Sequence, residues 1–228
     1  LPPPQRADAA LLRRGGGRER RRARGAPRLL RLPGDGEAAA RGQLDRRVAL
    51  FAILVATFAN YLTITVLTIA LRPVADELGA TIDDVAWVTI APALVSGLFT
   101  PAFGRIADRM GRRVVFRAGL VLFAFGTVGT ALATDLHSLI GFRLLTGVGS
   151  AASMPSGIAL ATSLYAPEER TIPMGYLTSV TAFAPARGVL VGGVVIESFS
   201  WRYLFWGQLP FVLGSLVAAF VAVPESRG

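Results

Sequence analysis

The sequence predicts an all-α membrane protein, a bundle of six transmembrane helices that follows a disordered tail. Three observations lead to this fold class. The chain is 52% hydrophobic with a mean hydropathy of +0.50, six apolar segments follow one another after residue 47, and short links join them. Each segment has about the 20 residues that a helix needs to cross a bilayer. The predicted spans are 48–71, 85–103, 114–134, 139–164, 172–196 and 203–223.

Residues 1–47 differ in composition from the rest of the chain. They contain 13 arginines and five acidic residues, with many glycines and prolines and few aromatics. Such a composition cannot bury a core, so it predicts a disordered segment. We therefore divide the chain into an Arg-rich cytoplasmic tail, 1–47, and a six-span domain, 48–228. A solvated tail, or a translation start placed too far upstream, is favoured over an arm that binds RNA or anionic lipid. No nucleic acid is therefore expected as a partner.

The arginines also predict how the helices cross the membrane. Seven arginines lie in or beside the links that follow the second, fourth and sixth spans, whereas the other three links hold two. By the positive-inside rule, the arginine-rich links and both termini lie in the cytoplasm of a multi-pass plasma-membrane protein. Trp87, Trp201, Tyr203 and Trp206 fall near the predicted outer span ends, where aromatic residues line the membrane interface.

The link between the second and third spans carries an unusual amount of charge. It reads GRIADRMGRRVVF, and its candidate functional residues are Gly104, Asp108, Arg109, Gly111, Arg112 and Arg113. The two glycines permit a tight turn and a close approach of helices. Asp108 and Arg112 are four residues apart, so they can pair if the stretch is helical.

This link resembles the signature of the major facilitator superfamily, Gly-x-x-x-Asp-Arg-x-Gly-Arg-Arg, at the position where that family carries it. The resemblance covers roughly 48–228 and implies that the chain is the N-terminal half of a transporter with twelve or fourteen spans. In the family the link is a conformational latch, in which the aspartate meets cationic groups and a helix N-terminus of the other half. The resemblance implies this role for Asp108 and its neighbours.

A second pattern lies at the start of the fourth predicted span. FRLLTGVGSAA is similar to the family pattern Arg-x-x-x-Gly-x-Gly-x-Ala, with Arg143, Gly147, Gly149 and Ala151 in the matching places. The small residues draw neighbouring helices close, so Arg143 is expected to face the central cavity. By resemblance, such an arginine helps to set when a proton or an anionic group binds and leaves. The segment Ser200–Pro210 also resembles the start of the sixth span in the multidrug:proton antiporter branch.

The fifth span resembles the signature of that antiporter branch, Gly-x8-Gly-x3-Gly-Pro-x-x-Gly-Gly. The residues that match it, together with a nearby proline, are Gly175, Gly188, Gly192, Gly193 and Pro185. The sequence departs from the signature at Ala184 and Val189, so the bend of this span is expected at Pro185, one turn earlier. Plain helix packing is the alternative role for these glycines.

Polar residues inside the spans are further candidates, because charge in hydrocarbon is costly. Arg143 and Arg187 are the charged residues that lie clearly inside spans, and Asn60 and Thr63 belong to a polar group in the first span. Fourteen-span relatives often carry an aspartate where Thr63 stands. The alternative for Asn60 and Thr63 is a hydrogen bond to a neighbouring helix.

Other site chemistry finds no support in the sequence. The chain has no cysteine, and its single histidine, His137, has no second ligand-type residue at metal spacing. No nucleophile-base-acid set or phosphate loop is present, so we expect no enzyme, no cofactor and no metal site. The predicted function is proton-coupled export of amphipathic small molecules, with protons, the lipid bilayer and a missing C-terminal half as partners. The alternatives are a transporter of one specific metabolite and a truncated, non-transporting membrane scaffold.

Overall fold

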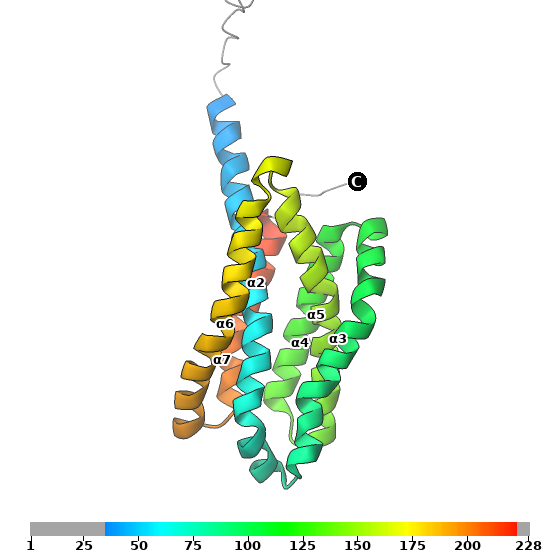
Figure 1. Cartoon of the computed structure of the whole chain (residues 1–228), viewed down its shortest axis with the longest axis vertical. Coiled ribbons are helices and arrows are strands. Elements are labelled where there is room, and N and C mark those ends of the chain that lie inside the picture. Colours follow the sequence, from blue (N-terminus) through cyan, green and yellow to red (C-terminus); the bar gives the residue numbers. More distant parts are fainter. Residues whose placement is uncertain (1–34, 223–228) are drawn as a thin grey trace, which may run out of the picture. The chain divides into compact units, whose positions relative to one another are not determined.

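The computed structural model describes residues 35–222, where six long helices are joined by short links (Figure 1). The helices are α2 (Asp35–Leu78), α3 (Ile82–Met110), α4 (Arg112–Leu132), α5 (Leu136–Ser163), α6 (Thr171–Ser198) and α7 (Arg202–Ala222), with a 3-10 turn, η2 (Pro167–Glu169), before α6. Each of the six is long and apolar enough to cross a membrane. The predicted fold class is confirmed.

The first helix begins earlier than the sequence analysis expected. α2 starts at Asp35, so residues 35–47, which were assigned to the tail, are helical. The segment Glu-Ala-Ala-Ala-Arg at 37–41 consists of strong helix formers, and extending an existing helix requires no new nucleus. Residues 1–34, the rest of the predicted tail, lie outside the described residues.

Two N-cap residues mark the starts of α3 and α5, and one glycine marks the end of α3. The Thr81 hydroxyl accepts a hydrogen bond from Asp84 N at 3.2 Å, and the Asp135 carboxylate accepts one from Ser138 N at 2.9 Å, so each caps the helix that follows. This backbone hydrogen bond holds the pKa of Asp135 below its usual value. Gly111 alone separates α3 from α4, and its φ of +97° reverses the chain within one residue.

Successive helices run antiparallel, as the short links require. Figure 1 shows the α3–α4 and α5–α6 links at one end of the bundle and the other three links at the opposite end. The arginine-rich links therefore share one end, which fits the alternation used in the sequence analysis. Which membrane face this end occupies stays a prediction.

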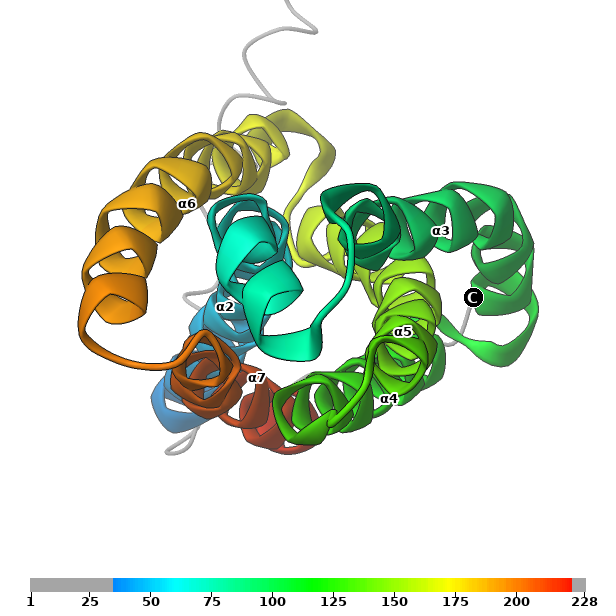
Figure 2. The same ribbon diagram turned by 90° about the horizontal axis from the view of Figure 1, so that it is seen from below.

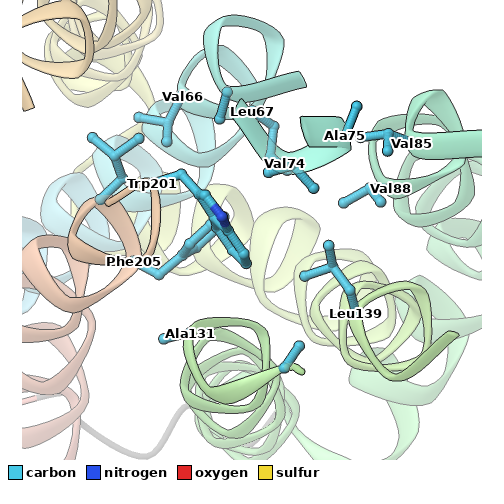
Figure 3. Close-up of a cluster of buried hydrophobic side chains, with 13 residues drawn as sticks. Val66, Leu67, Val74, Ala75, Val85, Val88, Ala131, Leu139, Trp201 and Phe205 are labelled. Carbon is cyan, nitrogen blue, oxygen red and sulfur yellow. The ribbon is translucent and has the colours of Figure 1, made fainter. Parts of the chain in front are cut away.

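The largest hydrophobic cluster lies near the end opposite the arginine-rich links and draws on α2, α3, α4, α5 and α7 (Figure 3). Trp201 is only 1% exposed and packs edge-on against Phe205. Its indole N–H donates to the Glu77 carboxylate at 2.6 Å, and Arg202 pairs with the same carboxylate. The assignment of Trp201 to an interfacial belt is wrong, because its nitrogen finds a partner inside the protein; Trp87, Tyr203 and Trp206 are exposed.

Glycines set the closest helix contacts. A Cβ at Gly119 of α4 would lie 2.8 Å from Gly149 O of α5, and one at Gly126 would lie 2.7 Å from Thr146 N. A Cβ at Gly129 would overlap the ring of Phe142. Backbones meet along this α4–α5 seam, which is how helices associate where lipid supplies no hydrophobic drive. The sequence analysis identified Gly149 as a packing residue but missed the three glycines of α4.

The two glycines of the GRIADRMGRRVVF link differ in role. Gly111 makes the predicted turn, whereas Gly104 lies inside α3 with no atom within 4 Å of the place a Cβ would occupy. Among the described residues Gly104 makes neither a turn nor a close helix approach, so a close approach there stays a prediction for the missing half.

This difference predicts opposite effects of alanine on stability. Gly111→Ala should destabilise the chain by about 1–3 kcal/mol, because a side chain is strained at this positive φ. Gly104→Ala should be neutral or stabilise by roughly 0.5–1 kcal/mol, because alanine is the better helix former. Thermal unfolding of the purified chain in detergent measures both. Equal effects of the two substitutions would contradict the assigned backbone conformations.

Candidate functional site

A pocket of about 340 Å³ lies between α2, α3, α4 and α5, four helices that Figure 2 shows from one end of the bundle. Apolar atoms form most of its wall. Its polar lining residues are Asn60, Thr63, Thr89, Ser96, Thr100, Arg143, Thr146 and Ser150. The structure thus brings three sequence-predicted candidates, Asn60, Thr63 and Arg143, to one cavity. It places the latch residues and the fifth-span glycines elsewhere.

Arg143 is the charged residue of this pocket. It lies on α5, is 3% exposed, and donates from Nε to the backbone oxygen of Val88 on α3 at 3.1 Å. In a regular helix that oxygen would accept from the N–H four residues later. Residue 92 is proline and has no N–H, so Val88 O has lost its helical donor. Arg143 takes the place of that donor and ties α5 to α3.

The same proline is a point of close contact between the two helices. A Cβ at Gly147 would lie 2.6 Å from Pro92 O and 2.8 Å from Pro92 Cα. Gly147 is one turn after Arg143, so the absence of a side chain there lets α5 approach α3 closely enough for the guanidinium to reach Val88. Arg143, Gly147 and Pro92 therefore act as one unit, of which the sequence analysis identified two members.

The charge of Arg143 has no counter-ion among the described residues. No carboxylate in residues 43–221 lies within salt-bridge distance of it, and its single hydrogen bond uses one of the five guanidinium N–H groups. The hydroxyl of Thr89, the residue after Val88, also has no hydrogen-bond partner. The pocket wall thus presents unused donors beside apolar surface.

The polar residues of α2 are bonded within the bundle. Asn60 and Thr63 donate to the carbonyls of Ala56 and Ala59 in their own helix, at 3.1 and 2.9 Å. Gln208 of α7 is 1% exposed and donates from Nε2 to Ala59 O at 2.8 Å and to the Thr63 hydroxyl. Thr63 therefore joins two helices, the alternative role considered for it.

The sequence analysis missed Gln208. Its signal was present, because it is the one glutamine after residue 47 and stands in an otherwise apolar predicted span. Pro92 was also missed. From the sequence alone, a proline in a helix indicates only a bend or a packing contact, because the residue that bonds to the carbonyl it frees is not known.

The latch residues lie around the α3–α4 turn. Arg112 and Asp108 pair at 3.4 Å, as predicted, but across the break at Gly111 and not within one helix. The Asp108 side chain is 67% exposed and that of Arg112 is 42% exposed. Arg109, in the last turn of α3, is exposed, and Arg113 is half-buried. An exposed pair of this kind contributes only about 0.3–0.5 kcal/mol.

The fifth-span candidates lie on α6 and divide into two pairs. A Cβ at Gly188 would lie 3.1 Å from Thr65 of α2, and one at Gly192 would lie 3.3 Å from Ile69, so these two glycines allow α6 to approach α2. At Gly175 and Gly193 no atom lies within 4 Å of the place that a Cβ would occupy. Pro185 lies inside α6, where it cannot donate to Thr181 O.

The Arg143–Val88 hydrogen bond predicts an energetic coupling between residues 143 and 92. Arg143→Met removes the donor to Val88 O. The resulting loss in free energy of unfolding should be larger when residue 92 is proline, because Val88 O is then unpaired, than when residue 92 is alanine. Pro92→Ala restores a helical N–H, so the double-variant cycle should show a coupling of about 1 kcal/mol in thermal or denaturant unfolding.

Pro101→Ala is the matched control, since Pro101 lies in the same helix but frees the carbonyl of Gly97. Its effect should add to that of Arg143→Met within about 0.5 kcal/mol. Additivity at both prolines would mean that the hydrogen bond to Val88 contributes nothing to stability.

Comparison with known proteins identifies the family of this chain. The sequence profile described as Major Facilitator Superfamily matches residues 53–228. The chain is 28% identical over 180 residues to the multidrug transporter protein MdtP of Bacillus subtilis, covering 79% of this chain and 33% of the relative. It is 27% identical over 178 residues to the tetracenomycin C resistance and export protein of Streptomyces glaucescens, covering 78% and 33%. The chain thus spans about a third of the length of these relatives.

The fold comparison agrees with the sequence profile. The structure matches the major facilitator proton:xylose symporter XylE, bound to 6-bromo-6-deoxy-D-glucose, with a TM-score of 0.68 and 16% identity. The match covers 82% of this chain and 46% of that protein. At this identity the likeness concerns the fold alone. Together with the profile over residues 53–228, it shows that the chain belongs to the Major Facilitator Superfamily.

Proposed function

We propose that this chain forms the N-terminal six-helix half of a proton-coupled exporter of amphipathic small molecules. The observation that carries the proposal is the pocket among α2, α3, α4 and α5, which combines a mostly apolar wall with one buried arginine. Such a wall suits molecules that have both an apolar body and a polar group. The relatives named for multidrug transport and for resistance and export favour efflux over uptake.

The surfaces of α3 and α6 support a missing second half. Of the six spans, these two bury the smallest share of their residues inside this chain. α6 also exposes Arg187 near its middle, and an intramembrane arginine faces protein or a water-filled cavity in preference to lipid. The proposed partner for this face is the C-terminal part of the transporter, since the match with this chain leaves about two thirds of each relative uncovered.

The pocket also bears on the coupling ion. Among its lining residues Arg143 is the charged one, and no carboxylate is present to carry a proton. We therefore assign the proton-carrying group to the part of the transporter beyond these six helices. Arg143 would then act on that group electrostatically, as its position between α3 and the cavity allows.

The link at Asp108 is proposed as the conformational latch. Its pairing with Arg112 is exposed and contributes a few tenths of a kcal/mol. A latch needs a larger difference between two states, so its main contact has to be with the other half. There the Asp108 carboxylate could accept charge-assisted hydrogen bonds worth roughly 1.5–3 kcal/mol.

The transport proposal is tested on the protein encoded by the reading frame continued past codon 228. Everted membrane vesicles that contain it should accumulate an amphipathic fluorescent dye when an acidic interior is imposed, and an uncoupler should abolish the accumulation. Vesicles from cells with an empty vector are the control. Movement of one metabolite only would favour the specific-transporter alternative, and no movement of any compound would favour the scaffold.

The latch proposal predicts a loss of transport without a loss of folding. Asp108→Asn should leave expression unchanged but lower accumulation roughly 10- to 100-fold, since 1.4 kcal/mol corresponds to a factor of ten. Asp83→Asn is the matched control, because Asp83 is an exposed aspartate at the other end of the same helix. If Asp108→Asn transports as well as Asp83→Asn, the latch proposal is wrong, and the charged link serves only to orient the helices in the membrane.

A further inference from the structure

We propose that the pocket contains an anion-binding subsite, formed by the guanidinium of Arg143 and the hydroxyl of Thr89, that selects amphipathic molecules with one carboxylate. This inference rests on the proposed transport function and names its substrate class. It depends on three features of the structure: an unpaired buried charge, a fixed orientation of that charge, and the composition of the surrounding wall.

The unpaired charge is the first step. Arg143 is 3% exposed and has no carboxylate partner in residues 43–221. A buried charge without a counter-ion costs several kcal/mol, and a hydrogen bond from Nε to one carbonyl offsets only a part of that cost. The two terminal NH₂ groups have no hydrogen-bond partner among the described residues. A bound carboxylate would supply both the opposite charge and a planar pair of acceptors for them.

The orientation of the guanidinium is the second step. Nε is fixed on Val88 O because Pro92 leaves that carbonyl without a helical donor. Thr89, the next residue of α3, lines the same pocket, and its hydroxyl has no partner. Thr89 and Arg143 therefore line one cavity, and each has a hydrogen-bond donor without a partner among the described residues. Pro92 acts as a positioning residue, since it creates the acceptor that holds Arg143 in place.

The wall of the pocket is the third step. Ile64, Pro92 and Phe123 supply apolar surface, and the volume of about 340 Å³ is at the small end of ligand pockets. A compact apolar body with one acidic group fits this composition. A cationic head group would meet Arg143 and no carboxylate among the lining residues, so two like charges would repel each other in the pocket.

The test measures binding to the full chain in nanodiscs of zwitterionic lipid. Three probes share one apolar body: 1-naphthaleneacetate, 1-naphthaleneacetamide and 1-naphthylmethylammonium. Isothermal titration should show that the carboxylate binds at least tenfold more tightly than the amide, and that the ammonium binds most weakly. Equal affinities for the acid and the amide would overturn the subsite.

Variants assign the preference to its residues. Arg143→Met should remove the preference for the carboxylate, and Thr89→Val should reduce it about threefold. Because Arg143→Met leaves Val88 O unpaired, the double variant Pro92→Ala/Arg143→Met provides a version whose backbone bond is restored, and it too should show no preference. Arg187→Met is the control, since it removes an intramembrane arginine that does not line the pocket and should keep the preference. A preference that persists in the double variant would contradict the assignment to Arg143.

Two further measurements separate this proposal from its alternatives. Addition of phosphatidylglycerol to the nanodiscs should not displace the acid; displacement would mean that the subsite holds a lipid head group and would overturn the substrate assignment. Efflux assays on the continued reading frame should show transport of the acid. Transport of the amide or the ammonium without the acid would refute the subsite and leave the exporter intact. Binding of the acid without any transport would refute the exporter and leave the subsite intact.

Discussion

A helix in hydrocarbon has to satisfy its own backbone, and Pro92 prevents α3 from doing so at Val88. The chain supplies Arg143 from α5, and Gly147 brings the two helices close enough for the bond. The position of the pocket's charge, the α3–α5 contact and the unused donors that face the cavity all follow from this one unsatisfied carbonyl.

Glycines that let helix backbones approach each other determine much of the remaining packing. Gly119, Gly126 and Gly129 join α4 to α5, while Gly188 and Gly192 let α6 approach α2 less closely. Bulky apolar residues fill the remaining space, as around Trp201 in Figure 3. Three of the helices around the pocket, α3, α4 and α5, therefore meet at backbone distance, whereas α6 presents much of its surface outward, as does the far side of α3. This contrast is what a half-transporter with one rigid wall and one face for a partner would show.

The fold and part of the site could be predicted from the sequence because they depend on local patterns. Apolar length gives the six spans, and the order Gly-Asp-Arg-Gly-Arg locates the α3–α4 turn. The start of α2 was missed because the arginine-rich composition of residues 1–47 was given more weight than the helix formers at 37–41. The burial of Trp201 and the interhelical role of Gln208 could not be predicted, because each depends on partners distant in sequence. Arg143 was found by its charge, but its bond to Val88 requires knowing that α3 and α5 meet at Pro92.

Among the described residues, three arginines donate to backbone carbonyls distant in sequence, and their surroundings distinguish them. Arg117 donates to Ala219 O and Phe220 O in the last turn of α7, at 2.8–3.1 Å, and Arg202 donates to Ala133 O just after α4, at 2.7 Å. Helix ends always leave such carbonyls open, and near the membrane surface water can replace the arginine. Arg143 instead meets a carbonyl within α3, which Pro92 leaves without its helical donor. Because Arg143 also lines the pocket and pairs with no carboxylate among the described residues, we assign its charge to the cavity and not to the stability of the bundle.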